Sequence, residues 1–375
     1  MDAAPVLLDR TGSSYALDDQ RWRGDDGGPL AVSPVPGLRP DLIVDSTRSL
    51  WRYEAALPVD PAHRVSLGEG LTPLVALAWG EHQVHFKLEW FNPTSSFKDR
   101  GVSVMVSHLR ALGADRVLED SSGNGGAAVA AYAAAAGIHA KIIVPATTSA
   151  AKILQARAFG AEIELVAGTR DEVSAEAVRQ SEQIPYASHN WHPMFVQGTK
   201  TIAYEIWEQL DFRAPDNVVL VAGAGSQVLG CDIAFTELLT AGQIDRLPRL
   251  LVGQPEHWAT IADAFNGTDP GIRGPRIPTI AEGASIATPV RLPETVEALR
   301  RCDGAAVAVP EQQIHDAVRA VASRGLYAEP TSAVAVAALD HFIDNGTITP
   351  DQTTVVVLTG SGLKSADKMA TLFPT

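Results

Sequence analysis

Short apolar runs alternate with longer amphipathic segments along most of the chain. The runs at 141–145, 217–221 and 354–358 are rich in β-branched residues and are bounded by Gly, Pro or polar residues. Continuous apolar runs of this length are typical of strands that are covered on both faces. The pattern predicts strands over 84–88, 115–119, 140–145, 161–166, 217–222, 249–253, 305–309 and 353–358.

Segments with helical periodicity lie between these runs and predict helices over 97–112, 124–136, 149–159, 170–182, 198–210, 226–242, 311–324 and 332–343. Alternation of strands and helices predicts an α/β fold with mainly parallel sheets between helical layers. We expect two three-layer αβα domains. The small domain would span 93–187, and the large one 47–92 with 188–375. The Gly/Pro/Asp-rich residues 1–46 read as an N-terminal extension.

The bulk composition narrows the class of protein. The 375 residues carry a formal charge of −14 and no Lys/Arg block, which disfavours nucleic acid and anionic membranes as partners. Two cysteines, Cys231 and Cys302, are too few for a disulfide scaffold. The start of the chain lacks the features of a signal peptide, and no apolar run reaches the ~18 residues of a membrane span. We therefore expect a cytoplasmic protein.

The decapeptide 92–101, Asn-Pro-Thr-Ser-Ser-Phe-Lys-Asp-Arg-Gly, places Lys98 at the start of a predicted helix. The partial positive charge of a helix N-terminus disfavours a cation and therefore favours a free amine. A free amine is what a Schiff base with an aldehyde requires. A surface lysine paired with Asp99 is the alternative for this residue alone.

Two glycine-rich turns follow predicted strands. The first, Ser121-Ser-Gly-Asn-Gly-Gly126, exposes backbone N–H groups that can bind a carboxylate, although it could also be a plain helix cap. The second, Gly223-Ala-Gly-Ser-Gln-Val-Leu-Gly230, is typical of a phosphate-binding turn. Val228 and the lack of a following acidic residue disfavour a Rossmann fingerprint. Cys231 and Asp232 stand where a P-loop has its Lys and Ser/Thr, which leaves a simple phosphomonoester.

A fourth motif, Leu358-Thr-Gly-Ser-Gly-Leu-Lys364, follows the last strand. The four motifs, in this order, resemble the fold-type-II pyridoxal phosphate (PLP) enzymes, in particular the threonine synthase and serine/threonine dehydratase group. The resemblance covers about 65–375 and implies a tryptophan synthase β-like fold. It also brings in two flanking stretches, Glu329–Ala333 and Ala281–Gly283.

The resemblance implies a role for each motif. Lys98 would hold PLP as a Schiff base and act as the catalytic base. Asn124 would bind the cofactor's 3′ oxygen, and Thr359 would meet its pyridine nitrogen. The phosphate would bind at Gly223, Ala224, Gly225, Ser226 and Gln227, and the substrate carboxylate at Ser121, Ser122, Gly123 and Asn124.

The segment 189–201 departs from the threonine synthase pattern, because Phe195 falls where that group has a phosphate-binding arginine. Desolvating a phosphate dianion against Phe195 and Trp191 would be costly. His189 is a candidate substrate contact, with polar packing as its alternative. His189 and His192 have no evident third partner, so we expect no metal site.

The expected protein is a PLP-dependent lyase or synthase that acts by β- or γ-elimination or replacement on a small α-amino acid. It would work as a homodimer in amino-acid metabolism. The open alternatives are a true threonine synthase that uses O-phosphohomoserine, a serine/threonine dehydratase and, more remotely, a Rossmann NAD enzyme.

Overall fold

The computed structural model describes residues 4–373. The chain forms two compact units, each built from discontinuous segments. Unit 1 comprises the described residues up to Gly70 together with Lys98–Thr201. Unit 2 comprises Leu71–Phe97 and the described residues from Ile202 onward.

Unit 1 contains a parallel three-stranded sheet in the order β6-β7-β8. The strands are β6 (Arg116–Glu119), β7 (His139–Pro145) and β8 (Glu162–Val166). The helices of this unit are α1 (Lys98–Ala111), α2 (Asn124–Ala136), α3 (Ala150–Ala158), α4 (Arg170–Gln180) and α5 (Pro193–Thr199). Helix α2 packs against β6 and β7 and against α1, which in turn packs against α5.

The N-terminal segment of unit 1 forms a small antiparallel sheet in the order β2-β1-β3. Its strands are β1 (Leu7–Leu8), β2 (Ser14–Tyr15) and β3 (Ala31–Val32). Trp22 packs edge-on against Tyr186 and Trp191, with ring centroids 5.1 Å apart in both pairs. Aromatic burial therefore fixes this Gly- and Asp-rich segment to the unit.

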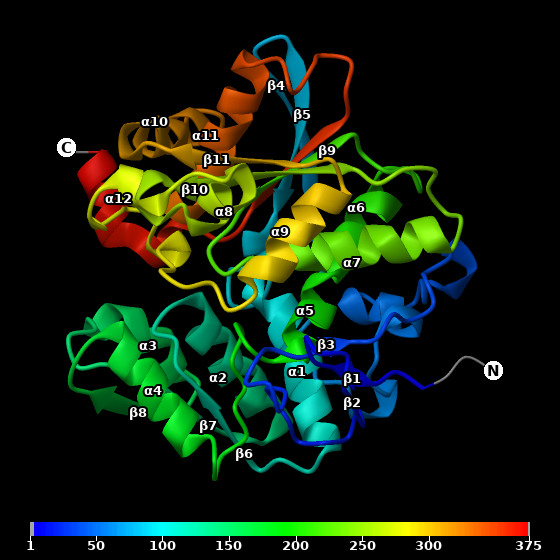
Figure 1. Cartoon of the computed structure of the whole chain (residues 1–375), viewed down its shortest axis with the longest axis vertical. Helices are drawn as coiled ribbons and strands as arrows, with labels where there is room; N and C mark the ends of the chain where they lie inside the picture. The colour runs from blue at the N-terminus through cyan, green and yellow to red at the C-terminus, as the bar shows by residue number, and fades with distance from the viewer. Residues whose placement is uncertain (1–3, 374–375) are drawn as a thin grey trace. The chain divides into compact units, whose positions relative to one another are not determined.

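Unit 2 contains a six-stranded sheet in the order β11-β10-β9-β12-β5-β4 (Figure 1). The strands are β4 (Leu74–Trp79), β5 (His82–Leu88), β9 (Asn217–Val221), β10 (Arg249–Pro255), β11 (Ala305–Val309) and β12 (Thr354–Leu358). Only β4 and β5 pair antiparallel within this sheet. The last strand, β12, lies between β9 and β5, with Thr354 opposite Asn217 and Val84.

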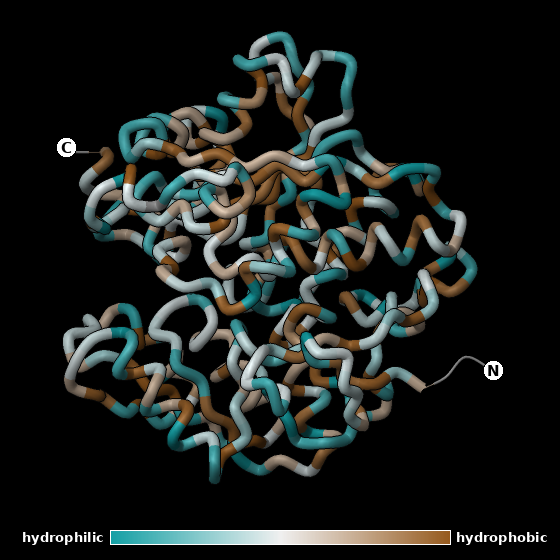
Figure 2. The backbone as a smooth tube through the Cα atoms, viewed as in Figure 1, coloured by the Kyte–Doolittle hydropathy of each residue, from teal (hydrophilic) through white to brown (hydrophobic). Residues whose placement is uncertain are grey.

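Helices cover both faces of this sheet. Helix α11 packs on β9, β10 and β12, and α10 packs on α11. On the other side, α7 contacts β9 and β10, and α9 contacts α7 and β10. The helices are α6 (Thr201–Gln209), α7 (Ser226–Thr240), α8 (Thr260–Asn266), α9 (Leu292–Arg301), α10 (Glu311–Ala322), α11 (Pro330–Asp344) and α12 (Ala366–Leu372). Figure 2 shows hydrophobic residues along the central strands of this sheet. Every residue of β9 and β12 is buried.

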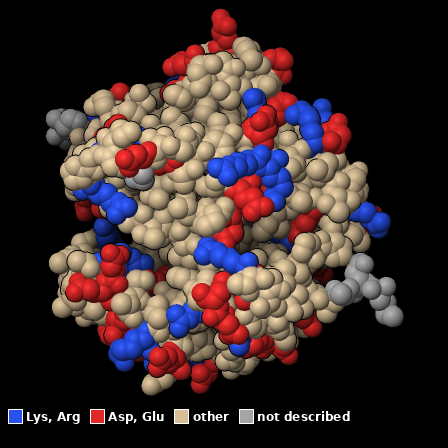
Figure 3. Space-filling model, viewed as in Figure 1, with Lys and Arg blue, Asp and Glu red and all other residues tan. Residues whose placement is uncertain are grey.

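The mixed α/β fold with mainly parallel sheets is confirmed. Residues 47–70 and 188–201, which the sequence analysis assigned to the large domain, are packed within unit 1. The predicted domain bounds themselves stay a prediction. Figure 3 shows acidic and basic side chains interspersed on the face in view. Among the described residues, no helix is long and apolar enough to span a bilayer.

Candidate active site

Lys98 is the first residue of α1. The three residues before it, all in unit 2, pair with the loop that follows β12. Ser96 forms an antiparallel bridge with Gly360, and the Phe97 N–H donates to the Thr359 carbonyl at 2.9 Å. The segment that leads into Lys98 is therefore fixed beside the predicted Thr359 loop.

Within unit 1, Lys98 Nζ lies 5.3 Å from the centroid of the Phe195 ring. Phe195 is fully buried in α5. Its ring packs against α1 at Gly101, where a Cβ would lie 2.5 Å from the ring carbons. The Phe195 ring therefore lies next to Lys98, at the position where a threonine synthase would have an arginine.

The Ser121–Asn124 turn connects β6 to α2, which begins at Asn124 with Gly123 as its N-cap. Ser121, Ser122, Gly123 and Asn124 are all at least partly accessible. The next residue, Gly125, approaches His189 so closely that a Cβ would lie 2.7 Å from Nδ1. The turn thus presents a helix N-terminus that can bind a carboxylate, and His189 lies beside it.

Glu119, the last residue of β6, bonds to His189 and was not singled out from the sequence. The His189 backbone N–H donates to Glu119 Oε2 at 3.1 Å, and His189 Nδ1 lies 2.9 Å from Oε1. The Glu119 side chain is 0% exposed and that of His189 is 10% exposed. The only signal in the sequence was the position of Glu119 at the carboxyl end of a parallel strand, where ligands of α/β proteins bind.

Burial perturbs both members of this pair. It raises the pKa of the Glu119 carboxyl to about 7, against the opposing effects of the His189 backbone N–H, Arg170 and Lys98. It lowers the pKa of the His189 imidazole well below its usual value, and the charge of Lys98 acts in the same direction. Perturbed titratable groups of this kind concentrate at functional sites.

In unit 2, the Gly223–Gln227 turn connects β9 to α7, which begins at Ser226. Gly225 caps the helix with φ +90°, and a Cβ there would lie 2.3 Å from Thr295 Oγ1. Gly223 approaches the Gly283 carbonyl, so the flanking stretch Ala281–Gly283 lies beside this turn. Only glycine fits both the conformation and the space at Gly225.

The Gln227 side chain supports an anionic ligand at this turn. It is buried, and its Nε2 has no hydrogen-bond partner among the described residues. A buried amide donor without a partner is costly unless a ligand or water satisfies it. An amide donor and the N–H groups of a helix start fit the phosphate of the expected cofactor.

Thr359, directly after β12, is also buried. Its Oγ1 lies 2.7 Å from Glu329 Oε1 and 2.9 Å from Ser332 Oγ. The structure thus brings Thr359 together with the predicted flanking stretch Glu329–Ala333.

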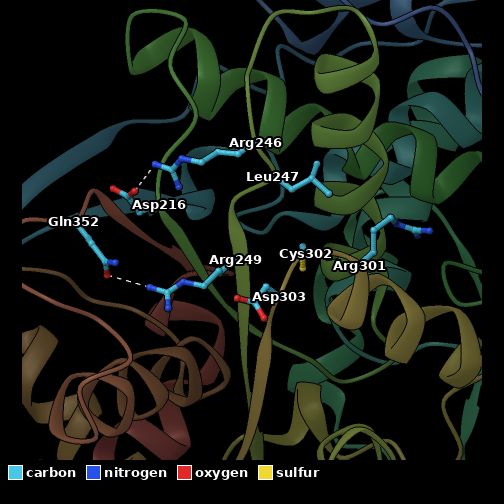
Figure 4. Close-up of a pocket in the computed structure, with 8 residues that line it drawn as sticks. All are labelled: Asp216, Arg246, Leu247, Arg249, Arg301, Cys302, Asp303 and Gln352. Carbon is cyan, nitrogen blue, oxygen red and sulfur yellow. Dashed lines mark hydrogen bonds and ion pairs between the residues drawn. The ribbon is translucent and has the colours of Figure 1, made fainter.

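A hollow of about 530 Å³ lies elsewhere in unit 2 and contains none of the predicted site residues (Figure 4). Its arginines are neutralised or bonded: Arg246 pairs with Asp216, Arg249 donates to Gln352 at 3.0 Å, and Arg301 pairs with Asp232 at 2.7 Å. Carboxylates therefore neutralise two of these arginines, and neutral hydrogen-bond acceptors engage the third, Arg249. In the part of the chain that the structure describes, no three His, Cys, Asp or Glu side chains gather as a metal site.

The sequence also matches a known protein family. The profile of the family described as "Pyridoxal-phosphate dependent enzyme" matches residues 65–360. The chain belongs to this family. The cofactor is therefore pyridoxal phosphate, and the family match disfavours the NAD alternative.

Curated relatives specify the branch of the family. The chain is 34% identical to the threonine synthase of Methanocaldococcus jannaschii over 374 residues, which cover 96% of this chain and 92% of the relative. It is 36% identical to that of Methanosarcina acetivorans, with 84% and 80% covered. For that of Mycobacterium tuberculosis H37Rv the identity is 35%, with 84% and 88% covered. The chain is a PLP-dependent lyase that is similar to threonine synthases.

Solved structures share the fold. Threonine deaminase isoform 2 of Solanum lycopersicum matches with a TM-score of 0.68 and 24% identity, over 80% of this chain and 83% of that one. O-ureido-L-serine synthase matches with a TM-score of 0.65 and 23% identity, over 78% and 90%. These likenesses confirm the fold-type-II architecture.

Proposed function

We propose that this enzyme binds PLP through Lys98 and eliminates or replaces a β or γ substituent of a small α-amino acid. The observation that carries the proposal is the position of Lys98 as the first residue of α1, inside the matched segment. The Lys98 amine would bond to the cofactor aldehyde as a Schiff base. When it is not bonded to the cofactor, the same Lys98 Nζ would be the base that accepts the α-proton of the substrate.

The cofactor contacts follow from the turns described above. The N–H groups of Gly223–Gln227 and the Gln227 amide would bind the phosphate, Asn124 the 3′ oxygen and Thr359 the pyridine nitrogen. When bound, the cofactor supplies a ring that withdraws electrons from the substrate's α-carbon. The hydroxyl of Thr359 does not protonate that ring as an aspartic acid would, which favours elimination and replacement over transamination.

The substrate would be held by its carboxylate at Ser121–Asn124, with His189 beside it. Phe195 supplies no charge near Lys98, so we expect O-phosphohomoserine to be a poor substrate. A charge-assisted contact to phosphate contributes about 1.5–3 kcal/mol, which is roughly a factor of ten to a hundred in affinity.

A cofactor and substrate survey tests this function. The purified protein should absorb visible light, and small hydroxy or substituted α-amino acids should change its spectrum and release ammonia and a keto acid or form a replacement product. A colourless protein that PLP does not colour would refute the proposal. Robust phosphate release from phosphohomoserine at low concentration would contradict the expectation of a poor substrate. It would mean that another cation, such as the buried Lys200 or Arg100, neutralises the charge of the substrate phosphate.

We further propose a cytoplasmic homodimer that binds neither nucleic acid nor membranes. The charge of −14 without a basic block supports the second part. Sedimentation velocity tests the first part, since a single species with the mass of one chain would contradict it.

A further inference from the structure

The Glu119–His189 pair is a buried acid–base pair that the proposed roles above leave without a chemical function. Glu119 bonds to His189 twice, through the backbone N–H and through Nδ1. These two hydrogen bonds do not use Nε2, the nitrogen on the opposite side of the ring, and the side chain is 10% exposed. Nδ1 of His189 is therefore occupied by Glu119, and Nε2 is the ring nitrogen that can bind a ligand.

Packing fixes the orientation of the imidazole. Gly125 of α2 lies against Nδ1, and the Phe195 ring lies edge-on with its centroid 5.8 Å from that of His189. Both contacts come from elements next to the proposed carboxylate turn and Lys98. A side chain that is held by a carboxylate on one edge and by two packed neighbours has the rigidity that a positioned catalytic group requires.

We propose that His189 is a catalytic acid that protonates the leaving group of the substrate from Nε2, and that Glu119 positions it and replaces the proton at Nδ1. This inference rests on the proposed elimination function. The substrate it selects is an α-amino acid whose β substituent is a hydroxyl group. A hydroxyl must leave as water and needs a proton, whereas a phosphate or halide leaves without one.

The step balances without any further reagent. Lys98 Nζ accepts the α-proton, the Cβ–O bond breaks, and its electron pair stays on the oxygen. His189 Nε2–H gives its proton to that oxygen, so water departs. The Glu119 carboxylic acid passes its proton to Nδ1, which leaves a carboxylate and a neutral imidazole.

The local charges support this distribution of protons. The charged groups that affect the pair are Lys98 on α1, Arg170 on α4 and Asp120 next to Glu119. The raised pKa of Glu119 and the lowered pKa of His189 favour a protonated carboxyl and a neutral ring with its hydrogen on Nε2. The acid form of Glu119, with its pKa of about 7, is present below that pH and is lost as the pH rises through it.

The test compares two substrates of the holoenzyme, L-serine and β-chloro-L-alanine, because chloride leaves without a proton. In Glu119→Gln the amide can donate to Nδ1 and keep the hydrogen on Nε2, but it cannot replace the proton. We expect kcat for serine to fall about 10²–10⁴-fold, the usual contribution of general acid catalysis. Turnover of chloroalanine should stay near wild type. Glu164→Gln, on β8 of the same sheet, is the matched control and should keep both activities.

The wild-type pH profiles give a second measurement that needs no variant to fold. Serine turnover should decline above pH about 7 while chloroalanine turnover does not follow it. Equal loss of both substrates in Glu119→Gln, or undiminished serine turnover, would overturn the inference. A wild-type enzyme that uses chloroalanine but not serine would also overturn it and leave the proposed function standing. Inactivity on both substrates would refute the function and, with it, this inference.

Discussion

Two glycines near Lys98 allow aromatic and imidazole rings to pack closely against the helices of the candidate site. Gly101 leaves room for the Phe195 ring, whose centroid lies 5.3 Å from Lys98 Nζ. Gly125 leaves room for His189 in the same way. Each glycine lies on a helix that begins within three residues, so the ring and the helix start approach each other closely. The site is therefore sensitive to single methyl groups.

Replacement of Lys98 tests the central assignment at this scale. Lys98→Ala removes both the covalent attachment and the proton acceptor, so turnover should fall by at least about 10²–10⁴-fold. The unfolding transition should stay cooperative. Enzyme assays with denaturant unfolding check both results, and Lys152→Ala, an exposed lysine on α3, is the control. Turnover at the wild-type rate in Lys98→Ala would show that another residue is the base.

The sequence could predict site residues that belong to local motifs, and it could not predict those that act through distant contacts. The turns at Ser121 and Gly223 were visible because glycine and small polar residues cluster there between a strand and a helix. Glu119 carries no such mark, since a carboxylate beside Asp120 at the end of a short strand is also typical of an ordinary exposed strand end. Its partner His189 lies 70 residues further along the chain, and only the folded unit brings the two together.

At the scale of elements, three predicted motifs coincide with helix starts. Helices α1, α2 and α7 begin at Lys98, Asn124 and Ser226. Each of the eight predicted strands is present, because short β-branched runs between glycine or proline breaks leave few alternatives. The structure therefore places the candidate site residues where backbone N–H groups of first turns are free of intrahelical bonds.

Other elements were missed or misplaced for identifiable reasons. Strand β4 is rich in Ala and Leu, which favour helices, and it becomes a strand only through antiparallel pairing with β5. The helix predicted over 198–210 is two helices, and the first begins at Pro193. There, the His192 Nδ1 accepts from the Met194 N–H at 3.3 Å, a cap that residue periodicity does not reveal. Helices α8, α9 and α12 also escaped prediction, and α8 and α12 are only seven residues long.

The α7 start offers a test with an internal control. Gly225→Val should weaken PLP binding, because its Cβ would lie 2.3 Å from Thr295 Oγ1 and distort the turn. Gly242, just beyond the other end of α7, has φ +67° and no atom within 4 Å of a Cβ. Gly242→Val therefore carries similar backbone strain, on the order of 1–3 kcal/mol, without the clash.

Equilibrium titration with PLP distinguishes the two variants. Both should unfold at lower denaturant concentration than the wild type, but only Gly225→Val should bind the cofactor more weakly. Equal PLP affinity in Gly225→Val and the wild type would show that this turn does not bind the cofactor phosphate.

At the scale of the whole molecule, cofactor binding and stability are linked. A ligand that binds only the folded state stabilises it by RT ln(1 + [L]/Kd), which is about 2.7 kcal/mol at 100 Kd. The apoenzyme's melting temperature should therefore rise with PLP concentration, and the rise should be smaller in Lys98→Ala. Thermal unfolding over a PLP titration measures this. A melting temperature that does not respond to PLP would argue against binding to the native protein.

The position of β12 has a consequence for how the chain is made. Strands β4–β5 and β9–β11 leave the ribosome as two groups, and the strand that joins them comes last in the sequence. Synthesis proceeds at about 5–20 residues per second, so β5 and β9 keep unpaired edges for several seconds or more. All of unit 1, by contrast, has been synthesised once residue 201 has been added. A message cut short before residue 354 would thus yield a chain with two open sheet edges, which is a target for chaperones and proteases.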